Sequence, residues 1–539
     1  MRLISKHSQK IISLFFMLSI VGIIASIPLL RGIHAPFTDV SDNDEVMLGQ
    51  ALLFNAGLPQ TYFDHTAYTF SLLLSFWLKF AYWISAIPLV DMHQLLLSTG
   101  PFGSLFAPLV YSGRIFIIIL AIVFVISFTG GLFLLTKDKI LSCALGLLLA
   151  TTQGIAIHSL VIRAELLSAY FFMLAVFSLL LALQSPIKKQ IFFIFMCGIF
   201  SYLALLTKVQ IVIGIFSLPF LALVFGKPKA PHQLMIERLN ADFNRISEVS
   251  CIILFTIVTF PLLVQSTLLL TTYRVSWYHY FIVLYFLIFG LIVKRFFLKS
   301  ILNTVTLFSA LFAGIGAGFY FNFFNYNPRN HKILMYFVEH GRSFIQERDN
   351  PRYVSGLFEN LVNTLYNKLP FISDVNKYAF SFIYLLLVIF CIVMLYKKNI
   401  LIVLKVLSLI GLSLFLEMVF RLRSYASFYF IYTDFLLILG VAIAWQSVMK
   451  SQAGKSDKHF IGICLAVLIM GCFNWRESYY NLKYNTFNGL TIRQPPNNFC
   501  HMSYYNPPLG KFINYKQYSG KEDLGICEKF ILRTKNELL

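Results

Sequence analysis

The stretch Ser112-Gly-Arg-Ile-Phe-Ile-Ile-Ile-Leu-Ala-Ile-Val-Phe-Val-Ile-Ser-Phe-Thr-Gly-Gly-Leu-Phe-Leu-Leu135 decides the fold class, because it has the length and composition of a membrane-spanning helix. A helix needs about 20 mostly apolar residues to cross the hydrocarbon core of a bilayer. The stretch meets that length, and its one charged residue, Arg114, lies near one end.

The rest of the chain has the same character. Of its 539 residues, 58% are hydrophobic and 13% are charged, whereas soluble domains have about 25% charged residues. The many Phe, Leu and Ile residues exclude disorder. A net charge of +20 would indicate nucleic acid binding in a soluble protein. Here the basic residues form short clusters between apolar runs, as in cytoplasmic loops. We therefore expect a lipid bilayer, and not a nucleic acid, as the partner.

Thirteen stretches are apolar and long enough to be candidate spans, which predicts an all-α polytopic membrane protein with about 13 transmembrane helices. The first span follows a basic start without a clear cleavage site, so we expect it to be retained. The stretches are 11–30, 112–135, 140–157, 166–184, 190–206, 209–226, 250–270, 278–293, 300–321, 378–396, 399–416, 428–448 and 459–475.

The basic clusters set the expected orientation. Lys188 and Lys189, like Lys397 and Lys398, lie in short loops on one side, and this side is cytoplasmic by the positive-inside rule. The N-terminus is then inside. Residues 67–84 are also long enough to span, but one additional span would turn every later basic loop outward.

Residues 67–84 are therefore expected to form a juxtamembrane helix at the outer interface. Trp77, Tyr82 and Trp83 suit the interfacial belt, and the Lys79 side chain can extend to the headgroups.

The long segments all face outward in this topology. They comprise two loops, 31–111 and 322–377, within a transmembrane module over 1–475, and a small C-terminal region over 476–539. In that region Cys500 and Cys527 are expected to pair in an oxidising compartment. The Cys and His spacing predicts no metal site.

Four carboxylates follow the first span within seven residues: Asp39, Asp42, Asp44 and Glu45. A helical run closed by Gly57 and Pro59 comes next. One or two acids would be enough to cap that helix and complement its dipole. Four are more than capping needs, so they are candidate catalytic or substrate-binding groups, with capping as the alternative.

Further polar residues lie at expected outer ends of spans. Arg163 and Glu165 are two apart, so on a helix they would not face each other, and we expect each to have another partner. A structural ion pair between them that orients the loop is the alternative. Glu417 and Asp434 lie near membrane depth, where acids are functional suspects, but we leave them out of the core site. The substrate-binding candidates are Asp64, His65, Arg163, Glu165, Lys208, Arg421 and Arg423. For the basic residues, snorkelling to the interface is the alternative.

The order of these features resembles the GT-C class of polytopic glycosyltransferases, which includes protein mannosyltransferases and lipid A aminoarabinose transferases. An acidic pair, Asp44-Glu45, follows the first span, and a helix from Ala51 to Gly57 comes next. The entry Tyr62-Phe-Asp-His-Thr-Ala-Tyr68 precedes the juxtamembrane helix, and Arg163-Ala-Glu165 and Leu206-Thr-Lys208 lie on the outer side. The first 230 or so residues carry the match.

The resemblance implies transfer of a sugar from a polyprenyl-phosphate donor, with inversion, at the periplasmic face of a bacterial inner membrane. A carboxylate near the membrane would be the general base. Asp44 or Glu45 comes first, then Asp42, then Asp39, because the segment can be aligned to the acidic pair in two registers. His65-Thr-Ala replaces the basic-Pro-Pro entry of the family.

The acceptor would be a glycan, a lipid or a protein. The sequence identifies no cofactor and does not fix metal dependence. A monophosphate-linked donor handled by Lys and Arg needs no metal, whereas the four acids could hold a divalent cation if the donor were a pyrophosphate. Two other functions stay open. A polysaccharide polymerase or O-antigen ligase would place its basic residues in a late loop such as 322–377. A lipid-linked sugar flippase or transporter would carry charges in mid-span.

Overall fold

The computed structural model describes residues 6–31, 33, 43–58, 67–98, 102–208, 211–226, 378–421, 430–451 and 471–472, and over these residues it is helical without a strand. Five helices in this part are long and apolar enough to cross a membrane: Leu105–Thr136, Ala164–Gln184, Lys189–Thr207, Ile400–Glu417 and Phe430–Val448. The prediction of a multi-span helical membrane protein is confirmed to that extent. The candidate spans between 250 and 321, and 459–475 apart from 471–472, lie outside the described residues.

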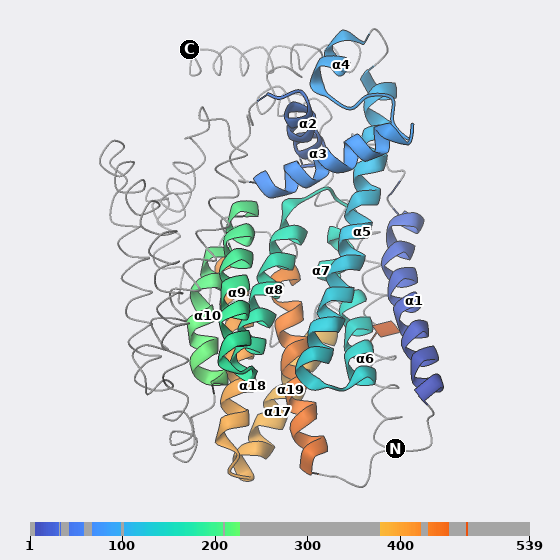
Figure 1. Cartoon of the computed structure of the whole chain (residues 1–539). Coiled ribbons are helices and arrows are strands. Elements are labelled where there is room, and N and C mark those ends of the chain that lie inside the picture. The colour runs from blue at the N-terminus through green and yellow to red at the C-terminus, as the bar shows by residue number, and fades with distance from the viewer. Residues whose placement is uncertain are drawn as a thin grey trace, which may run out of the picture.

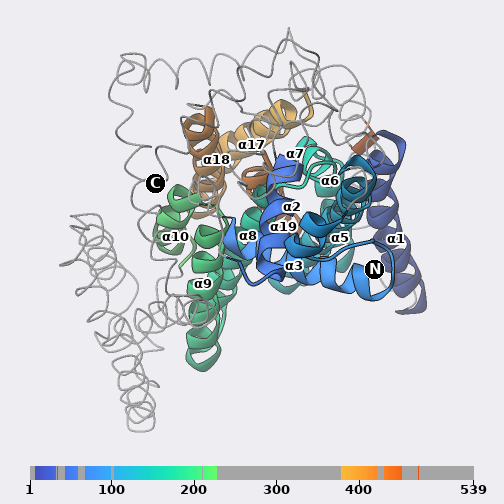
Figure 2. The same ribbon diagram turned by 90° about the horizontal axis from the view of Figure 1, so that it is seen from above.

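The long helices pack side by side as a bundle (Figures 1 and 2). They are α1 (Lys6–Arg31), α5 (Phe102–Thr136), α6 (Lys139–Ala150), α8 (Ala164–Gln184), α9 (Ile187–Thr207), α10 (Val212–Phe225), α17 (Tyr378–Tyr396), α18 (Ile400–Arg421) and α19 (Asp434–Ser451). The closest neighbours are α8 with α9, α18 with α19, and α5 with α6. One continuous apolar core joins these helices.

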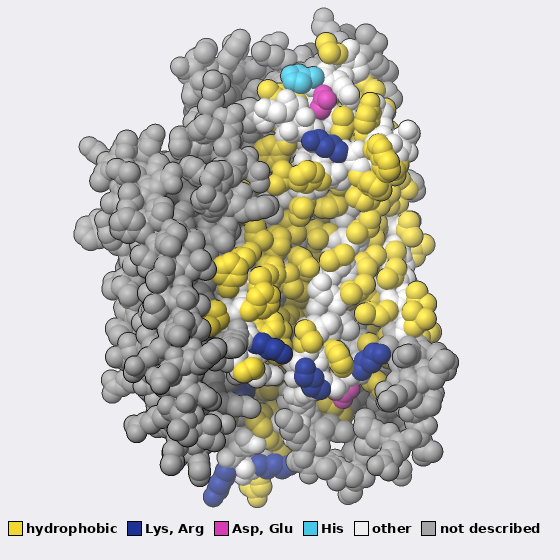
Figure 3. All heavy atoms as spheres, in the orientation of Figure 1, with side chains coloured by type: hydrophobic (Ala, Val, Ile, Leu, Met, Phe, Trp, Pro, Cys, Tyr) yellow, Lys and Arg dark blue, Asp and Glu magenta, His cyan; other side chains and the backbone are white. Residues whose placement is uncertain are grey.

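Three helices of the first long loop gather at one end of the bundle, which we call the outer end (Figure 1). They are α2 (Asn43–Asn55), α3 (Tyr68–Trp83) and α4 (Met92–Leu97). At the opposite end, short connections carry Lys137, Lys397 and Lys398, and the first turn of α9 carries Lys189. Figure 3 shows basic side chains there. The inside position of the N-terminus, which rests on these basic residues, stays a prediction.

Helix α5 begins at Phe102, about ten residues before the predicted span. Its 35 residues correspond to about 52 Å at 1.5 Å per residue, which exceeds the ~30 Å hydrocarbon core. Pro108 lies inside the helix at the cost of one backbone hydrogen bond. Helices α2 and α3 both pack against α5, and the contacts of α3 include Ser112 and Phe116, at the start of the predicted span.

The predicted span 140–157 is broken in two. Helix α6 ends at Ala150, and α7 (Gln153–His158) begins after Thr152, whose hydroxyl accepts a hydrogen bond from the Ile155 N–H at 3.3 Å. Thr151, Thr152 and His158 are all buried. A helix break among apolar helices is tolerated when the protein buries it and satisfies its polar groups.

The predicted helix end at Gly57 is confirmed, whereas the interfacial position of residues 67–84 stays a prediction. Gly57, with φ +69°, ends α2 in the left-handed conformation, and α3 crosses the ends of the spans instead of running beside them (Figure 1). Tyr82 and Trp83 are exposed. Trp77 is not, because it faces α5 and its indole N–H donates to the backbone oxygen of Ser112 at 2.9 Å.

Candidate functional site

A buried ion pair lies at the outer end of α8 and α9. The Nζ of Lys208 lies 2.8 Å from Oε1 of Glu165, and both side chains are almost fully buried. Because α8 and α9 are antiparallel and joined by a short connection, the first turn of α8 and the end of α9 meet at the same level. Glu165 also lies where the α8 dipole favours a carboxylate.

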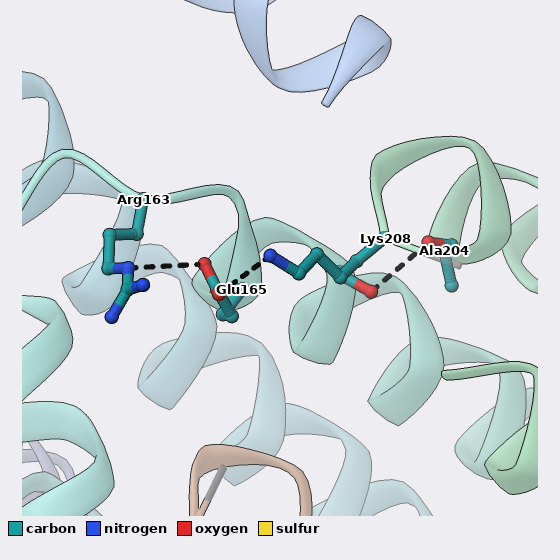
Figure 4. A network of polar contacts seen from close by, with 5 residues as sticks. Arg163, Glu165, Ala204 and Lys208 are labelled. Carbon is teal, nitrogen blue, oxygen red and sulfur yellow. Dashed lines mark hydrogen bonds and ion pairs between the residues drawn. The ribbon is translucent and has the colours of Figure 1, made fainter. Parts of the chain in front are cut away.

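Arg163 approaches the same carboxylate from the other side (Figure 4). Its Nε lies 3.7 Å from Oε2 of Glu165, and its side chain is 14% exposed. The expectation that Arg163 and Glu165 would not meet is wrong, because Arg163 precedes α8 with an extended backbone, at φ −133° and ψ 147°. The expectation that Glu165 has another partner is confirmed by Lys208.

The end of α9 holds Lys208 in place. The backbone N–H of Lys208 donates to the Ala204 carbonyl at 2.9 Å. The Ser168 hydroxyl of α8 donates to that same carbonyl at 3.1 Å. The two helices are therefore tied together one turn below the ion pair.

The start of α3 is hydrogen-bonded to the residue that precedes Lys208. The N–H of Ala67 donates to the Thr207 carbonyl at 3.0 Å, and Ala67 has a φ of +40°, which is uncommon for a residue with a side chain. The next residue, Tyr68, packs against Leu206 and against Phe54 of α2, with ring centroids 5.3 Å apart. Burial raises the pKa of the Tyr68 hydroxyl above its usual value.

Helix α2 approaches the site through Gly113 of α5. A Cβ on Gly113 would lie 2.6 Å from Cδ1 of Ile162 and 3.2 Å from Cδ2 of Leu48. Leu48 of α2 and the residue before Arg163 therefore meet over this glycine. Asp44 lies one helical turn before Leu48, in the first turn of α2. The start of α2 thus belongs to the same outer end as the ion pair.

The structure brings together three of the predicted site residues, Arg163, Glu165 and Lys208. It describes the backbone, and not the side chains, of Asp44 and Glu45 at the start of α2 and of Arg421 at the end of α18. The remaining candidates lie outside the described residues: Asp39, Asp42, Asp64, His65, Arg423, Cys500 and Cys527. Within the described part of the chain, no group of three or more His, Cys, Asp or Glu could hold a metal ion.

A second buried polar group, which we call the inner joint, connects α7, α18 and α19. The Thr433 hydroxyl donates to Oε1 of Glu417 at 3.1 Å. A Cβ on Gly154 would lie 2.7 Å from both Oδ2 of Asp434 and the backbone nitrogen of Ile431. The two acids were suspected because of their depth, but the role of Gly154 was missed, since a lone glycine gives no sequence signal of what it touches.

Sequence reasoning also missed the connection made by Arg114. Its side chain is almost fully buried, and its Nη1 donates to the Ile33 carbonyl at 3.2 Å. Arg114 therefore joins the start of the first outer loop to α5. An arginine at a span end is a weak signal, because such residues commonly extend to the interface.

Comparison with known proteins gives one structural likeness. The chain is similar to the Archaeoglobus fulgidus oligosaccharyltransferase in its apo form, a crystal structure, with a TM-score of 0.42 and 12% sequence identity. The match covers 98% of this chain and 60% of that enzyme, so the chain spans less than two thirds of its length. Neither a protein-family model nor a curated protein sequence matches the chain.

Proposed function

We propose that the protein is a membrane glycosyltransferase that moves a sugar from a polyprenyl-phosphate donor to an acceptor at the outer end of the bundle. The observation that carries this proposal is the buried Glu165–Lys208 pair with Arg163 beside it, directly below the start of α3. Two cations share one carboxylate, so the group has a formal charge of +1.

This charge suits an anionic leaving group. When the bond between the anomeric carbon and the phosphate oxygen breaks, negative charge develops on the lipid phosphate, and nearby fixed cations stabilise it. Arg163 is the more exposed of the two cations, so it is the residue that meets the phosphate first. The buried ammonium group of Lys208, which Glu165 holds in place, adds positive charge on the protein side of the phosphate.

A carboxylate of the acidic cluster would be the general base. It takes the proton of the acceptor hydroxyl, the acceptor oxygen bonds to the anomeric carbon, and the lipid phosphate leaves from the opposite face with inversion. Asp44 and Glu45 are the first choices, since their helix contacts the segment before Arg163 through Leu48. Asp42 and Asp39 follow in that order.

The other candidates take supporting roles. Asp64 and His65 precede Ala67 by two or three residues, and a chain extends at most about 3.5 Å per residue. They are therefore within reach of the Thr207 carbonyl, to which Ala67 binds, and would hydrogen-bond the sugar. Arg421 and Arg423, after α18, would give the phosphate further positive charge.

The setting proposed for this reaction is the periplasmic face of a bacterial inner membrane, with a glycan, lipid or protein as acceptor. The net positive charge of the Arg163, Glu165 and Lys208 group suits a monophosphate donor, which Lys and Arg can bind without a metal. If the donor were a pyrophosphate, the acidic cluster could hold a divalent cation.

The test is transfer of labelled sugar from polyprenyl-phosphate donors by membranes that contain the Asp44→Asn protein. We expect transfer to fall about 100-fold or more at unchanged abundance and insertion. Asp39→Asn is the matched control and should keep most activity. Full activity of Asp44→Asn, Glu45→Gln and the double variant would return the cluster to a capping role. Absence of transfer by the wild type with every such donor would overturn the proposal and favour a ligase or a transporter.

A further inference from the structure

We infer that a single turn of α5, Ser112-Gly-Arg114, sets the distance between the acidic cluster and the Glu165–Lys208 pair, and that Arg114 is a positioning residue for the proposed general base. The attachments to this turn stand on described contacts. Their consequence for catalysis rests on the proposed function, because it concerns the carboxylate that takes the proton of the acceptor.

The three residues of this turn contact different parts of the molecule. Consecutive residues of a helix point about 100° apart, so they can reach separate neighbours. The backbone and hydroxyl oxygens of Ser112 accept the indole N–H of Trp77 in α3, at 2.9 and 3.0 Å. Gly113 lies against α2, and Arg114 reaches the end of the first helix. Seen from above, α2 and α3 lie beside α5 (Figure 2).

Arg114 fixes the chain where it leaves α1. Its side chain is 1% exposed, and its Nη1 donates to the Ile33 carbonyl. The N–H of Ile33 donates in turn to the Pro28 carbonyl, in the last turn of α1, at 2.8 Å. A hydrogen bond from a charged donor is about twice as strong as a neutral one. The backbone of Ile33 is therefore held from both sides, by α1 and by α5.

Gly113 fixes α2 against the segment that leads into α8. Leu48 of α2 and Ile162 meet over this glycine, and a Cβ there would lie 2.6 Å from Cδ1 of Ile162. Ile162 directly precedes Arg163 in the chain. Because position 113 has no side chain, α2 can approach this segment closely across α5.

The acidic cluster therefore lies in the sequence between two attachments to neighbouring residues of α5. Ile33 precedes the cluster and is held by Arg114, whereas Leu48 follows it and rests on Gly113. Misplacement of a reacting group by about 1 Å can cost about 100-fold in rate, so a base in residues 39–45 needs a fixed reference. Because the segment before the ion pair rests on the same glycine, both halves of the proposed site share this reference.

The experiment compares Arg114→Met with the wild type in two measurements. The variant removes the donor to Ile33 and keeps a long side chain in the buried position. Transfer from polyprenyl-phosphate donors gives kcat and the donor KM. Hydrogen–deuterium exchange of the full chain in detergent gives the local opening of each helix. Ser127→Ala is the matched control, since it also removes a hydrogen bond of α5, to Tyr170 at 3.3 Å, several turns further along the helix.

We expect kcat of Arg114→Met to fall about tenfold or more. The donor KM should stay within about threefold of the wild type, because Arg163 and Lys208 are unchanged. Amides in the first turns of α2 should exchange about tenfold faster or more, whereas those of α8 and α9 keep their rate. Ser127→Ala should alter neither measurement.

Three results would overturn the inference. Unchanged exchange in α2 would mean that Arg114 does not hold the acidic segment. An equal increase in every helix would mean that it stabilises the whole bundle. An unchanged kcat, or a raised KM at constant kcat, would mean that the attachment does not position the base.

Gly113→Ala tests the second attachment without removing a charge, and it takes the place of Arg114→Met if that variant does not insert. The new methyl group meets Cδ1 of Ile162, and Ile162→Val removes that atom. We expect kcat to fall about threefold or more in Gly113→Ala and to recover in Gly113→Ala/Ile162→Val. No loss, or no recovery, would contradict the shared reference.

The exchange measurement does not depend on catalysis. Faster exchange of α2 in Arg114→Met, in a protein whose wild type transfers no sugar from any such donor, would refute the proposed function and keep the attachment.

Discussion

The outer site and the inner joint both bury carboxylates at helix ends, yet their surroundings differ. At the outer site Glu165 faces two cations, and Arg163 reaches the surface. At the inner joint Glu417 accepts from the neutral hydroxyl of Thr433, and the backbone at Ile431 closes onto Gly154 with no room for a methyl group. An acid at membrane depth is therefore not a functional site by depth alone. Cations beside a buried carboxylate, one of them reaching the surface, are what we expect of a site that binds an anionic substrate. Close packing of backbone onto a glycine is what we expect of a structural joint between helices.

The largest expected effect is at Lys208. Lys208→Met removes the cation that lies 2.8 Å from the buried Glu165 carboxylate and leaves the Arg163 Nε at 3.7 Å, which should lower the free energy of unfolding by about 3–5 kcal/mol. Thermal unfolding in detergent measures this change. Lys405→Met is the control, since this lysine lies over the Phe225 ring at 5.6 Å and should cost about 1 kcal/mol or less.

The double variant Lys208→Met/Glu165→Gln sharpens this prediction. It removes both charges and should recover most of the lost stability, while donor binding stays impaired. If the single and double variants were equally unstable, the ion pair would not be the source of the effect, and the contrast with the inner joint would fail.

Gly154→Ala should come next. The added methyl group would lie 2.7 Å from a backbone nitrogen, so α7 and the turn before α19 must separate, at a cost of about 2–3 kcal/mol. Gly411→Ala is the matched control, because a Cβ at Gly411 meets open space. Retained thermal stability of Gly154→Ala would show that the inner joint is looser than the outer site.

Thr433→Val tests the neutral hydrogen bond of the inner joint. Loss of the donor to Glu417 should cost about 1–2 kcal/mol, with little change in donor affinity. Thr433→Ser keeps the hydroxyl and should stay near wild type. A loss of donor binding with Thr433→Val but not with Thr433→Ser would instead make the inner joint part of the substrate site.

The smallest effect concerns Tyr68, which lies beside the outer site and whose pKa is raised by burial. In the unfolded chain this phenol ionises near pH 10, whereas burial raises its pKa in the native protein. The native state then binds more protons, so stability falls as the pH rises above about 10. Because the chain has 28 tyrosines, the measurement is the difference between wild type and Tyr68→Phe. The variant should lose less stability between neutral pH and pH 11, and equal losses would contradict a buried, neutral Tyr68.

Much of the architecture could be predicted, because hydrocarbon imposes a simple rule on composition. Spans such as 112–135 and 166–184 were visible as apolar runs, and Gly57 was visible as a helix end. The break at Thr152 and the early start of α5 at Phe102 were not visible. Buried polar groups can satisfy a break, and neighbouring helices can support a longer helix, but neither leaves a mark in local hydropathy.

The candidate site divides in the same way. Arg163, Glu165 and Lys208 could be selected one by one, as charges at the ends of apolar runs. Their partnership could not, because Lys208 lies 43 positions after Glu165 in the sequence, and only the antiparallel packing of α8 and α9 brings the two residues to one level. 

The sequence by itself determined that the chain is a multi-span helical membrane protein, and it predicted the side on which the basic residues collect. Both follow because transfer of charge and of apolar surface between water and lipid depends on local composition. Only the tertiary structure decided that Lys208 faces Glu165, that Ala67 binds Thr207 and that Gly154 admits no side chain. Those contacts join residues far apart in the chain, and their energies depend on distance and burial, which composition does not encode.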